Sequence, residues 1–505
     1  MSDNLYSLIR ARITDPAKTF IETGDGRRFS YGDTFDLAGR FANALVALGV
    51  QPGDRVAVQV DKSAEALILY LGVVAAGAIY LPLNIGYTLT ELEYFIGDAE
   101  PRVVVCRPSV AAELAPLAKR LGVAHCETLG VKGDGSLMDK AKAAAPAFDP
   151  VPRGPNDLAA ILYTSGTTGR SKGAMLSHRN LFSNAATLVE YWRFTASDVL
   201  LHALPIFHTH GLFVASNVIL LAGASMIFLP KLDPDEMIRH LPRATSMMGV
   251  PTFYVRLLQH SALTKDLVKH VRLFVSGSAP LLADTHKEWE ARTGHRILER
   301  YGMTETNMNT SNPYDGDRVA GTVGFPLPGV DLRITDPETG RPLAQGEIGM
   351  IEVKGPNVFQ GYWRMPEKTA AEFRADGFFI TGDLGKIDER GYVHIVGRGK
   401  DLVISGGYNV YPKEVETEID GLPGVVESAV IGVNHPDFGE GVTAVVVGGK
   451  DCTLDEAAVL KALDGRLAKF KLPKRVFFVD DLPRNTMGKV QKNLLREQYK
   501  DIYTR

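Results

Sequence analysis

Short apolar runs alternate with helical segments from the N-terminus to about residue 320. Residues 55–60 (RVAVQV) and 158–164 (LAAILYT) are two such runs, and both have the length and composition of buried strands. Residues 102–106 and 271–277 repeat the pattern. Strands that alternate with helices favour sheets whose strands are largely parallel. The sequence therefore predicts an α/β fold for most of the chain.

The pattern changes after about residue 320, where short strands are separated by glycine-bearing turns. Residues 346–355 and 391–397 are examples, and they indicate an antiparallel or barrel-like β section within a large N-terminal domain. A polar joint, GRGKD, follows at 397–401. The roughly 100 residues beyond it alternate between helix and strand patterns, which is enough for a small α+β domain. We expect the domain boundary at residues 398–400.

Length and composition are those of an ordinary globular protein and exclude several classes. The 505 residues allow two or three domains, and 45% of them are hydrophobic. A formal net charge of −3 lacks the basic excess of a nucleic-acid-binding protein. Cys106, Cys126 and Cys452 are scattered and odd in number, so we expect neither a disulfide framework nor a zinc site. These cysteines, with no apolar leader pattern at the N-terminus, favour a reducing, cytoplasmic location.

Residues 66–83 carry no charge over 18 positions, a length that would suffice to span a bilayer. Gly72 and Gly77 interrupt the run, and Pro82 follows a segment rich in β-branched and aromatic residues. No other segment supports insertion into a membrane. We therefore expect a buried helix that ends near Gly77, then a short core strand, and no membrane association.

A loop rich in Thr, Ser and Gly, YTSGTTGRSKG at 163–173, follows the predicted strand at 158–164. It lacks the spacing of a Walker loop, in which the lysine directly follows the second glycine. Its glycines allow the backbone to approach an anion, its hydroxyls can donate hydrogen bonds, and Lys172 adds a positive charge. A surface turn is the alternative interpretation of this loop taken alone. The candidate phosphate-binding residues are Thr164, Ser165, Gly166, Thr167, Thr168, Gly169 and Lys172.

Four further motifs follow this loop along the chain. Together the five resemble the core motifs of the acyl-adenylate-forming superfamily, which includes acyl-CoA synthetases, luciferases and peptide-synthetase adenylation domains. The resemblance extends from about residue 20 to residue 495, and it implies a large N-terminal domain with a small, mobile C-terminal domain. The four motifs are YGMTET (301–306), TGDLGKI (381–387), GRGKDLVISGGYNVYPKEVE (397–416) and PRNTMGKVQKN (483–493).

The resemblance implies a reaction in two steps. A carboxylate attacks the α-phosphate of ATP and releases pyrophosphate, and the thiol of CoA then displaces AMP from the acyl-AMP. The 163–173 loop would hold the β- and γ-phosphates, whereas a Walker loop supports transfer of the γ-phosphate. Glu305 would bind Mg²⁺ with the phosphates, and Asp383 and Arg398 would contact the ribose. The other residues that the resemblance places around the nucleotide are Ser278, Ala279, Pro280, Glu299, Tyr301, Gly302, Met303 and Thr304.

The resemblance also assigns roles near the C-terminus. Lys489 matches the catalytic lysine, whose ammonium would stabilise charge as the carboxylate attacks the α-phosphate. Lys400 matches the hinge position, where one or two residues absorb a rotation of the small domain. That rotation would bring Gly406 and Gly407 into place to guide the pantetheine arm of CoA. The implied division is a large domain at 1–398, a hinge at 399–400 and a small domain at 401–505.

One departure from the superfamily pattern concerns the acid. Arg300 stands just before Tyr301, where many members have glycine and so leave room for a bulky acyl chain. A guanidinium that faces the acyl pocket would exclude a fatty tail and bind a second carboxylate. This pattern resembles that of malonyl-CoA synthetases, with His208 in LPIFHTHG (204–211) as a second donor. In the alternative interpretation, Arg300 turns away and pairs with Glu299 or another acid.

The sequence thus predicts an ATP-dependent, AMP-forming ligase that joins malonate to CoA, and it leaves the use of methylmalonate open. The alternatives are a ligase for another small carboxylic acid, an enzyme that loads the pantetheine of a carrier protein, and a non-catalytic nucleotide-binding protein. Lys489 and Glu305 argue against the last of these. The implied cofactors are ATP, Mg²⁺ and CoA as co-substrate. The implied partners are a small dicarboxylate and an acetylation enzyme that would remove the charge of Lys489.

Overall fold

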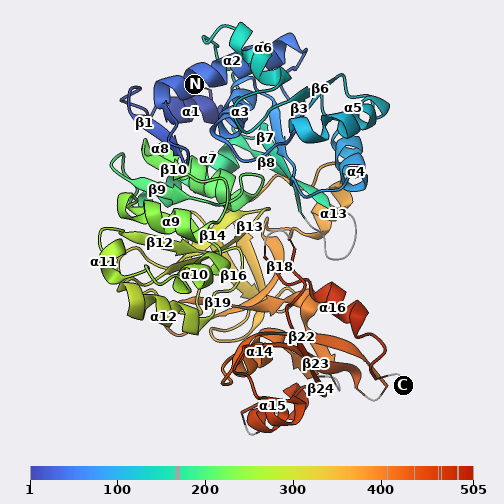
Figure 1. Cartoon of the computed structure of the whole chain (residues 1–505). Coiled ribbons are helices and arrows are strands. Elements are labelled where there is room, and N and C mark those ends of the chain that lie inside the picture. The colour runs from blue at the N-terminus through green and yellow to red at the C-terminus, as the bar shows by residue number, and fades with distance from the viewer. Residues whose placement is uncertain are drawn as a thin grey trace. The chain divides into compact units, whose positions relative to one another are not determined.

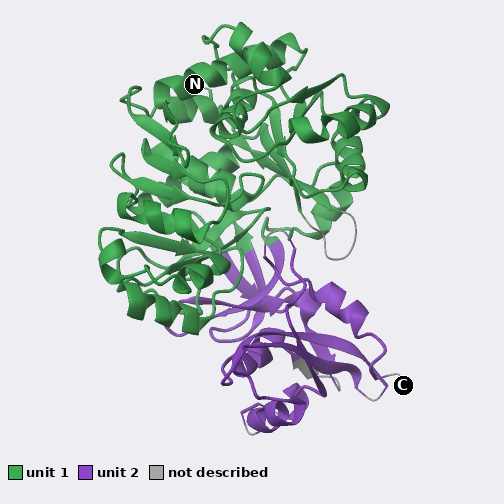
Figure 2. Cartoon of the chain, in the orientation of Figure 1, with its two compact units in different colours: residues 1–331, 353–379 green, residues 332–352, 380–505 purple. Residues whose placement is uncertain are grey.

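The structure is a computed structural model that describes residues 2–164, 171–405, 408–436, 438–464, 466–467, 469–485 and 488–503. By their contacts, the residues form two units, which Figure 2 colours separately. Unit 1 comprises residues 1–331 and 353–379, and unit 2 comprises residues 332–352 and 380–505. The joint expected at 398–400 lies within unit 2, at a short 3-10 turn, Gly399–Asp401 (η4). Its role as a hinge stays a prediction.

Two sheets form the framework of unit 1 within the described residues (Figure 1). The six-stranded sheet has the order β6-β5-β3-β4-β7-β8, and all its pairs are parallel except β7 with β8. The nine-stranded sheet has the order β15-β14-β13-β12-β11-β9-β10-β1-β2. Its central pairs are parallel, and its antiparallel pairs lie at the two ends. The predicted α/β class with parallel-rich sheets is confirmed.

The elements of unit 1 fall where the apolar runs of the sequence place them. The strands are β1 Thr19–Thr23, β2 Arg28–Ser30, β3 Arg55–Gln59, β4 Ile79–Pro82, β5 Val103–Cys106, β6 His125–Thr128, β7 Leu158–Thr164, β8 Lys172–Ser177, β9 Val199–His202, β10 Ser225–Phe228, β11 Ser246–Gly249, β12 Leu273–Ser276, β13 Leu298–Met303, β14 Asn307–Ser311 and β15 Phe325–Pro326. The helices are α1 Leu5–Arg10, α2 Tyr31–Ala47, α3 Ala64–Ala75, α4 Leu89–Ala99, α5 Ala111–Arg120, α6 Ser136–Ala143, α7 His178–Tyr191, α8 Asn217–Ala222, α9 Pro234–His240, α10 Pro251–Leu258, α11 Lys265–Val268, α12 Ala283–Thr293 and α13 Pro366–Ala371.

The uncharged stretch at 66–83 forms most of the buried helix α3 and the core strand β4, as predicted. Every residue of α3 is buried. The helix packs closely on α2, because a Cβ atom at Gly72 would lie 2.7 Å from Cβ of Phe41. Gly77 then takes a φ of +71°, which a glycine adopts without strain and which reverses the chain into β4. None of the described helices is long and apolar enough to cross a membrane.

Unit 2 contains a four-stranded sheet, β16-β17-β18-β19, and a sheet of β20 to β24. Within the described residues, three helices accompany the second sheet, which confirms the predicted α+β domain. The sequence pattern predicts a helix over 454–468, but α15 ends at Leu463 because Asp464 turns to an extended conformation before a glycine. The elements are β16 Asp331–Thr335, β17 Gly349–Lys354, β18 Phe379–Ile387, β19 Val393–Arg398, β20 Val403–Ser405, β21 Tyr408–Val410, β22 Val425–His435, β23 Gly439–Gly448, β24 Arg475–Val479, α14 Pro412–Asp420, α15 Glu456–Leu463 and α16 Lys492–Gln498.

The burial of α3 predicts a large difference between two leucine truncations. Leu69 in α3 is fully buried, whereas Leu89 at the start of α4 is 40% exposed. Leu69→Ala should lower the free energy of unfolding by about 2–5 kcal/mol, because it removes buried methyl groups and leaves a cavity. Leu89→Ala, the control, should cost less than about 0.5 kcal/mol. Urea denaturation of both variants measures the difference, and equal losses would contradict the buried position of α3.

Candidate active site

The two ends of the 163–173 loop meet in a β-hairpin. Thr164 closes β7, Lys172 opens β8, and the two residues are paired across the antiparallel register. The hydroxyl of Thr164 donates to the carbonyl oxygen of Lys172 at 3.4 Å. The hydroxyl of Tyr94 donates to the carbonyl oxygen of Ser171 at 2.7 Å. The predicted phosphate-binding residues 165–169 lie outside the described residues. Their contacts with a nucleotide stay predictions.

Lys172 lies against a carboxylate and an aromatic ring. Its Nζ is 3.1 Å from Oε1 of Glu372 and 4.0 Å from the ring centre of Tyr362. Lys368 reaches the same carboxylate oxygen at 2.8 Å. Burial alone would raise the pKa of Glu372, but hydrogen bonds from Lys368, Tyr362 and Lys172 outweigh it and hold that pKa below its usual value. Glu372 is therefore an ionised partner of Lys172.

Glu305 sits at the tip of a tight hairpin between β13 and β14. The hairpin requires glycine at 302, because a Cβ atom there would lie 1.9 Å from the carbonyl oxygen of Asn307. Phe359 fixes the tip by donating its backbone N–H to the carbonyl oxygen of Glu305 at 2.8 Å. Glu305 is 6% exposed, and its carboxylate accepts a hydrogen bond from the hydroxyl of Tyr362 at 3.0 Å. The motif thus places a buried acid next to the hydroxyl of Tyr362. We call Lys172, Tyr362, Lys368 and Glu372 the Lys172 cluster.

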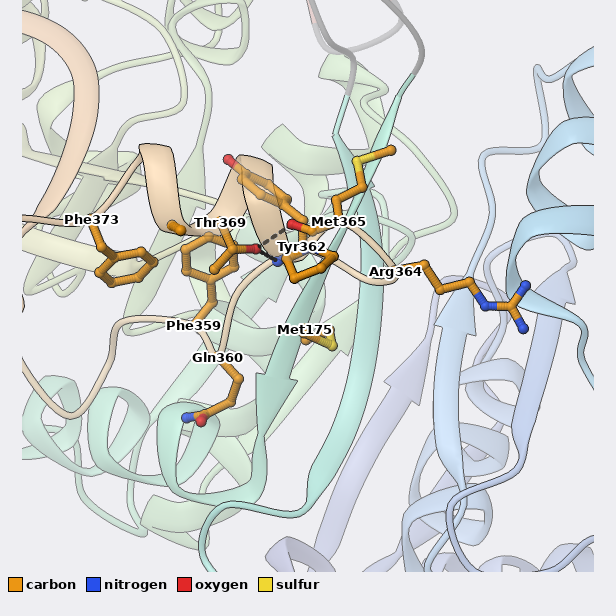
Figure 3. Close-up of a pocket in the computed structure, with 10 residues that line it drawn as sticks. Met175, Phe359, Gln360, Tyr362, Arg364, Met365, Thr369 and Phe373 are labelled. Atoms are coloured by element: carbon orange, nitrogen blue, oxygen red, sulfur yellow. Dashed lines mark hydrogen bonds between the residues drawn. The ribbon is translucent and has the colours of Figure 1, made fainter.

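Tyr362 joins the two acids. Its hydroxyl lies 2.6 Å from Oε2 of Glu372 and 3.0 Å from Oε1 of Glu305. Burial and then the charge of Glu305 raise the pKa of Tyr362, so the hydroxyl keeps its proton and donates. Figure 3 shows how the backbone is held: the N–H of Tyr362 donates to Oγ1 of Thr369, which donates to the carbonyl oxygen of Met365, both at 2.9 Å. The open hollow of about 610 Å³ beside them has largely apolar walls.

The donor set around Glu305 fits a hard cation that is shared with a ligand. Within the residues that the structure describes, no group of three or more His, Cys, Asp or Glu side chains could hold a metal ion. One buried carboxylate oxygen is nevertheless the kind of ligand that Mg²⁺ takes from a protein when phosphates and water supply the others. Glu305 therefore suits Mg²⁺ bound together with a polyphosphate.

Arg300 is buried, and no residue that the structure describes forms an ion pair with it. It is 3% exposed, and its Nε and Nη2 atoms have no hydrogen-bond partner among the described residues. The guanidinium lies over Gly277, where a Cβ atom would come within 2.4 Å of Cζ. It does not pair with Glu299, whose Oε1 lies 3.2 Å from Nδ1 of His286 and accepts the N–H of Gly321 at 3.3 Å. Burial lowers the pKa of Arg300 to about 9, which leaves it cationic at neutral pH.

His210 is the functional candidate that the sequence did not single out. It is 1% exposed, its Nδ1 lies 3.2 Å from Oγ of Ser278, and its Nε2 is unpartnered among the described residues. Burial and then the charge of Arg300 lower its pKa, so the imidazole is neutral. His208, the predicted residue, is less buried and accepts the N–H of His210 at Nδ1, at 3.3 Å. Thr209 adds a buried hydroxyl without a partner in the described chain. The motif HTH contains two candidates, and only the packing distinguishes them.

The backbone around these side chains is unusual. Gly211 tolerates no side chain, because a Cβ atom there would lie 2.1 Å from the carbonyl oxygen of Pro205. The chain then continues as a π-helical segment, His210–Ser216 (η2), a conformation that occurs frequently at functional sites. Ser278 takes a φ of +73°, which is strained for a residue with a Cβ atom. The tight turn at Gly211, after β9, and the turn at Ser278, after β12, thus hold His210 and Ser278 together.

The residues predicted to surround adenine lie in the loop that follows β12 and in the neighbouring strand β13. Ser278, Ala279 and Pro280 follow β12 directly, and Tyr301 lies in β13, which pairs with β12 in parallel. Residues 302–304 continue β13 into the hairpin tip that carries Glu305. The structure therefore gathers these positions at one edge of the nine-stranded sheet. Their contact with a nucleotide stays a prediction.

Asp383 and Arg398 face each other in unit 2. They are partners in the antiparallel register of β18 and β19, and Nε of Arg398 lies 3.1 Å from Oδ1 of Asp383. Asp383 is 4% exposed. Lys400 follows in the η4 turn; partial desolvation and then the charge of Arg398 lower its pKa to about 8, although its side chain reaches solvent. The predicted ribose-binding pair is thus held together, and its ligand stays a prediction.

Lys489 ends a short loop that closes on itself. The N–H of Asn485 donates to the carbonyl oxygen of Lys489 at 2.9 Å, and the N–H of Lys489 donates to Oδ1 of Asn485 at 3.0 Å. These bonds fix the backbone from which the side chain projects. Gly406 and Gly407, the residues expected to guide pantetheine, lie outside the described residues.

Comparisons with known proteins identify the family of the chain. The chain matches the sequence model of the AMP-binding enzymes over residues 10–363 and that of the AMP-binding enzyme C-terminal domain over 414–489. It is 34% identical to a malonate--CoA ligase of Arabidopsis thaliana over 94% of this chain and 85% of that protein. It is 35% identical to a feruloyl-CoA synthase of an Amycolatopsis species over 97% of each chain.

A solved structure matches the whole chain. The crystal structure of ATP-bound MatB from Rhodopseudomonas palustris is 69% identical, the alignment covers 100% of both chains, and the TM-score is 0.98. The resemblance that five ordered motifs indicated is thereby confirmed, and the chain belongs to the AMP-binding enzyme family.

Proposed function

We propose that the chain is an ATP-dependent, AMP-forming ligase that joins malonate to CoA. The observation that carries the choice of acid is the buried cation Arg300, two of whose nitrogen atoms have no partner in the described part of the chain, together with the neutral imidazole of His210. Such a pocket favours a ligand that brings its own negative charge. The related proteins include malonate--CoA ligases from Arabidopsis thaliana and from Mus musculus, the latter 37% identical over 84% of this chain.

The two carboxylates of malonate have different tasks. One attacks the α-phosphate of ATP and becomes the mixed anhydride of malonyl-AMP. The other enters the acyl pocket, where Arg300 supplies the opposite charge and His210 a hydrogen-bond donor at Nε2. An uncompensated charge in a buried pocket costs several kcal/mol, so pairing of the two buried charges favours a dicarboxylate over a monocarboxylate.

The phosphates belong to the Lys172 cluster. Lys172 and the hairpin ends would hold the β- and γ-phosphates, and Glu305 would hold Mg²⁺ with them. When bound, the ion neutralises charge on the phosphates and makes pyrophosphate a better leaving group. Asp383 and Arg398 would bind the ribose hydroxyls, and the Ser278–Pro280 turn with Tyr301 would enclose adenine.

The small domain would serve both steps in turn. Lys489 would bridge the attacking carboxylate and the α-phosphate during adenylation. A rotation at Lys400 would then replace it by the 405–409 loop, along which the thiol of CoA reaches malonyl-AMP. Acetylation of Lys489 would remove its charge and stop the first step. Three free cysteines support a reducing, cytoplasmic location for the enzyme.

Release of AMP from ATP tests the proposal and its alternatives. The assay uses acetate, malonate, methylmalonate and succinate in turn, each with and without CoA. The proposal requires the largest kcat/KM with malonate and thioester formation with free CoA. Preference for acetate would indicate a ligase for another small acid. Adenylation without thioester formation from CoA would favour an enzyme that loads a carrier protein.

Arg300→Gly should lower kcat/KM for malonate by at least ~100-fold, the low end for the loss of a buried charged pair. It should spare or improve turnover of propionate, because the unpaired cation is gone. Arg256→Ala, which removes an exposed arginine from α10, is the control and should leave both values unchanged. A preference for malonate over propionate that survives Arg300→Gly unaltered would remove Arg300 from the recognition of the second carboxylate.

Lys489→Ala should slow formation of malonyl-AMP by ~10²–10³-fold, the range for loss of one preorganised transition-state donor. Thioester formation from supplied malonyl-AMP should change much less, because Lys489 acts only in the first step. Single-turnover measurement of each half-reaction separates the two effects. Equal losses in both half-reactions would be incompatible with the role given to Lys489.

Lys400→Pro should fix φ at the proposed hinge and restrict its rotation. Malonyl-AMP should still form at a similar rate, whereas transfer of the acyl group to CoA should collapse. The same single-turnover measurements apply. Near-normal rates in both half-reactions would place the hinge elsewhere.

A further inference from the structure

The surroundings of Lys172 assign a task to an acid that none of the five motifs contains. We propose that Glu372 is the counter-ion of Lys172 and that it competes with the phosphates of ATP for this lysine, so that it weakens the binding of both ATP and pyrophosphate. The proposal rests on the proposed function in one respect, namely that Lys172 binds the phosphates.

The carboxylate of Glu372 is held firmly in the position from which it contacts Lys172. It follows the last turn of α13, and both of its oxygen atoms have partners. Oε1 lies 3.1 Å from Nζ of Lys172 and 2.8 Å from Nζ of Lys368, and Oε2 accepts the hydroxyl of Tyr362 at 2.6 Å. The side chains of Lys172 and Glu372 are each 20% exposed. This is a half-buried, three-point attachment and not a loose surface ion pair.

The geometry makes Glu372 a competitor. The ring of Tyr362 covers one side of the Lys172 ammonium, at 4.0 Å, and Glu372 covers another. A phosphate oxygen that binds the ammonium must either displace this carboxylate or lie a few ångströms from a like charge. Partial burial reduces the screening of that repulsion. Both outcomes reduce the affinity for a polyphosphate.

Tyr362 prevents Glu372 from simply turning away. Its hydroxyl contacts both Glu372 and Glu305, so the counter-ion is tied to the acid that is suited to Mg²⁺. The backbone of Tyr362 is itself fixed through Thr369 (Figure 3). A phosphate-binding lysine with a fixed competitor releases pyrophosphate more readily than one without, which matters because product release limits many enzymes.

Binding measurements without turnover test the proposal. The dissociation constants of Mg²⁺–ATP and of pyrophosphate are measured by calorimetry on the full chain, with neither carboxylic acid nor CoA present. Glu372→Gln should tighten both by about three- to tenfold, the scale of one partly screened ion pair. Lys172→Ala should weaken both. In the Lys172→Ala background, Glu372→Gln should no longer tighten binding, because the competition requires the lysine.

A matched variant separates this effect from a change in net charge. Glu367 is an exposed acid in the first turn of the same helix, and Glu367→Gln should leave both dissociation constants unchanged. Thermal unfolding confirms that each variant is folded, and Glu372→Met replaces Glu372→Gln if the latter is not.

The outcomes test separately whether Lys172 binds the phosphates and whether Glu372 competes with them. If Lys172→Ala leaves ATP binding unchanged, the assignment of Lys172 to the phosphates fails, and part of the proposed function fails with it. If Lys172→Ala weakens binding but neutral Glu372 does not tighten it, the counter-ion role alone is overturned. It is also overturned if Glu367→Gln tightens binding as much as Glu372→Gln does.

Discussion

The burial of the Arg300 guanidinium, for which the described residues supply no counter-ion, is the constraint on which the proposed acyl site depends. Arg300 lies on β13 and is 3% exposed, and its charge is one of the causes that lower the pKa of the buried His210 imidazole. A protein does not bury a charge at this cost without something to offset it. The carboxylate of a small diacid would offset it, and a fatty tail or a methyl group would not. The choice of acid therefore follows from the electrostatics of one side chain.

Backbone positions that exclude side chains make this burial possible. Arg300 occupies the space over Gly277, Gly211 lets the 204–211 loop fold back, and Gly302 permits the hairpin that carries Glu305. Glycine is needed at these three places because a side chain would not fit there, and not because the loops must be flexible. These glycines bring strand ends from the nine-stranded sheet together, so that the residues proposed to line the acyl pocket, to enclose adenine and to bind Mg²⁺ lie at one edge of this sheet.

Much of this could be predicted from the sequence, and the reasons for the remainder are physical. Apolar runs predicted α3 and β4. Ordered motifs predicted that Glu305, Asp383 and Arg398 bind Mg²⁺ and ribose, and these roles stay predictions. The ion pair between Asp383 and Arg398 does not test them. The role of His210 could not be predicted, because either histidine of HTH satisfies the same pattern. Glu372 could not be predicted either: it is 200 positions from Lys172 along the chain, and only tertiary packing joins them. The early end of α15 could have been predicted from the sequence, because Asp-Gly at 464–465 is a turn signal.

In the proposed function, Arg300 recognises a negative charge and not merely the shape of a three-carbon acid. Malonamate, the monoamide of malonate, has nearly the same size but carries an amide where malonate carries its second carboxylate. The most direct measurement compares kcat/KM for malonate and malonamate with the unmodified enzyme. We expect malonate to be preferred by at least ~100-fold, since the amide leaves a buried cation uncompensated. Similar values for the two acids would contradict the account.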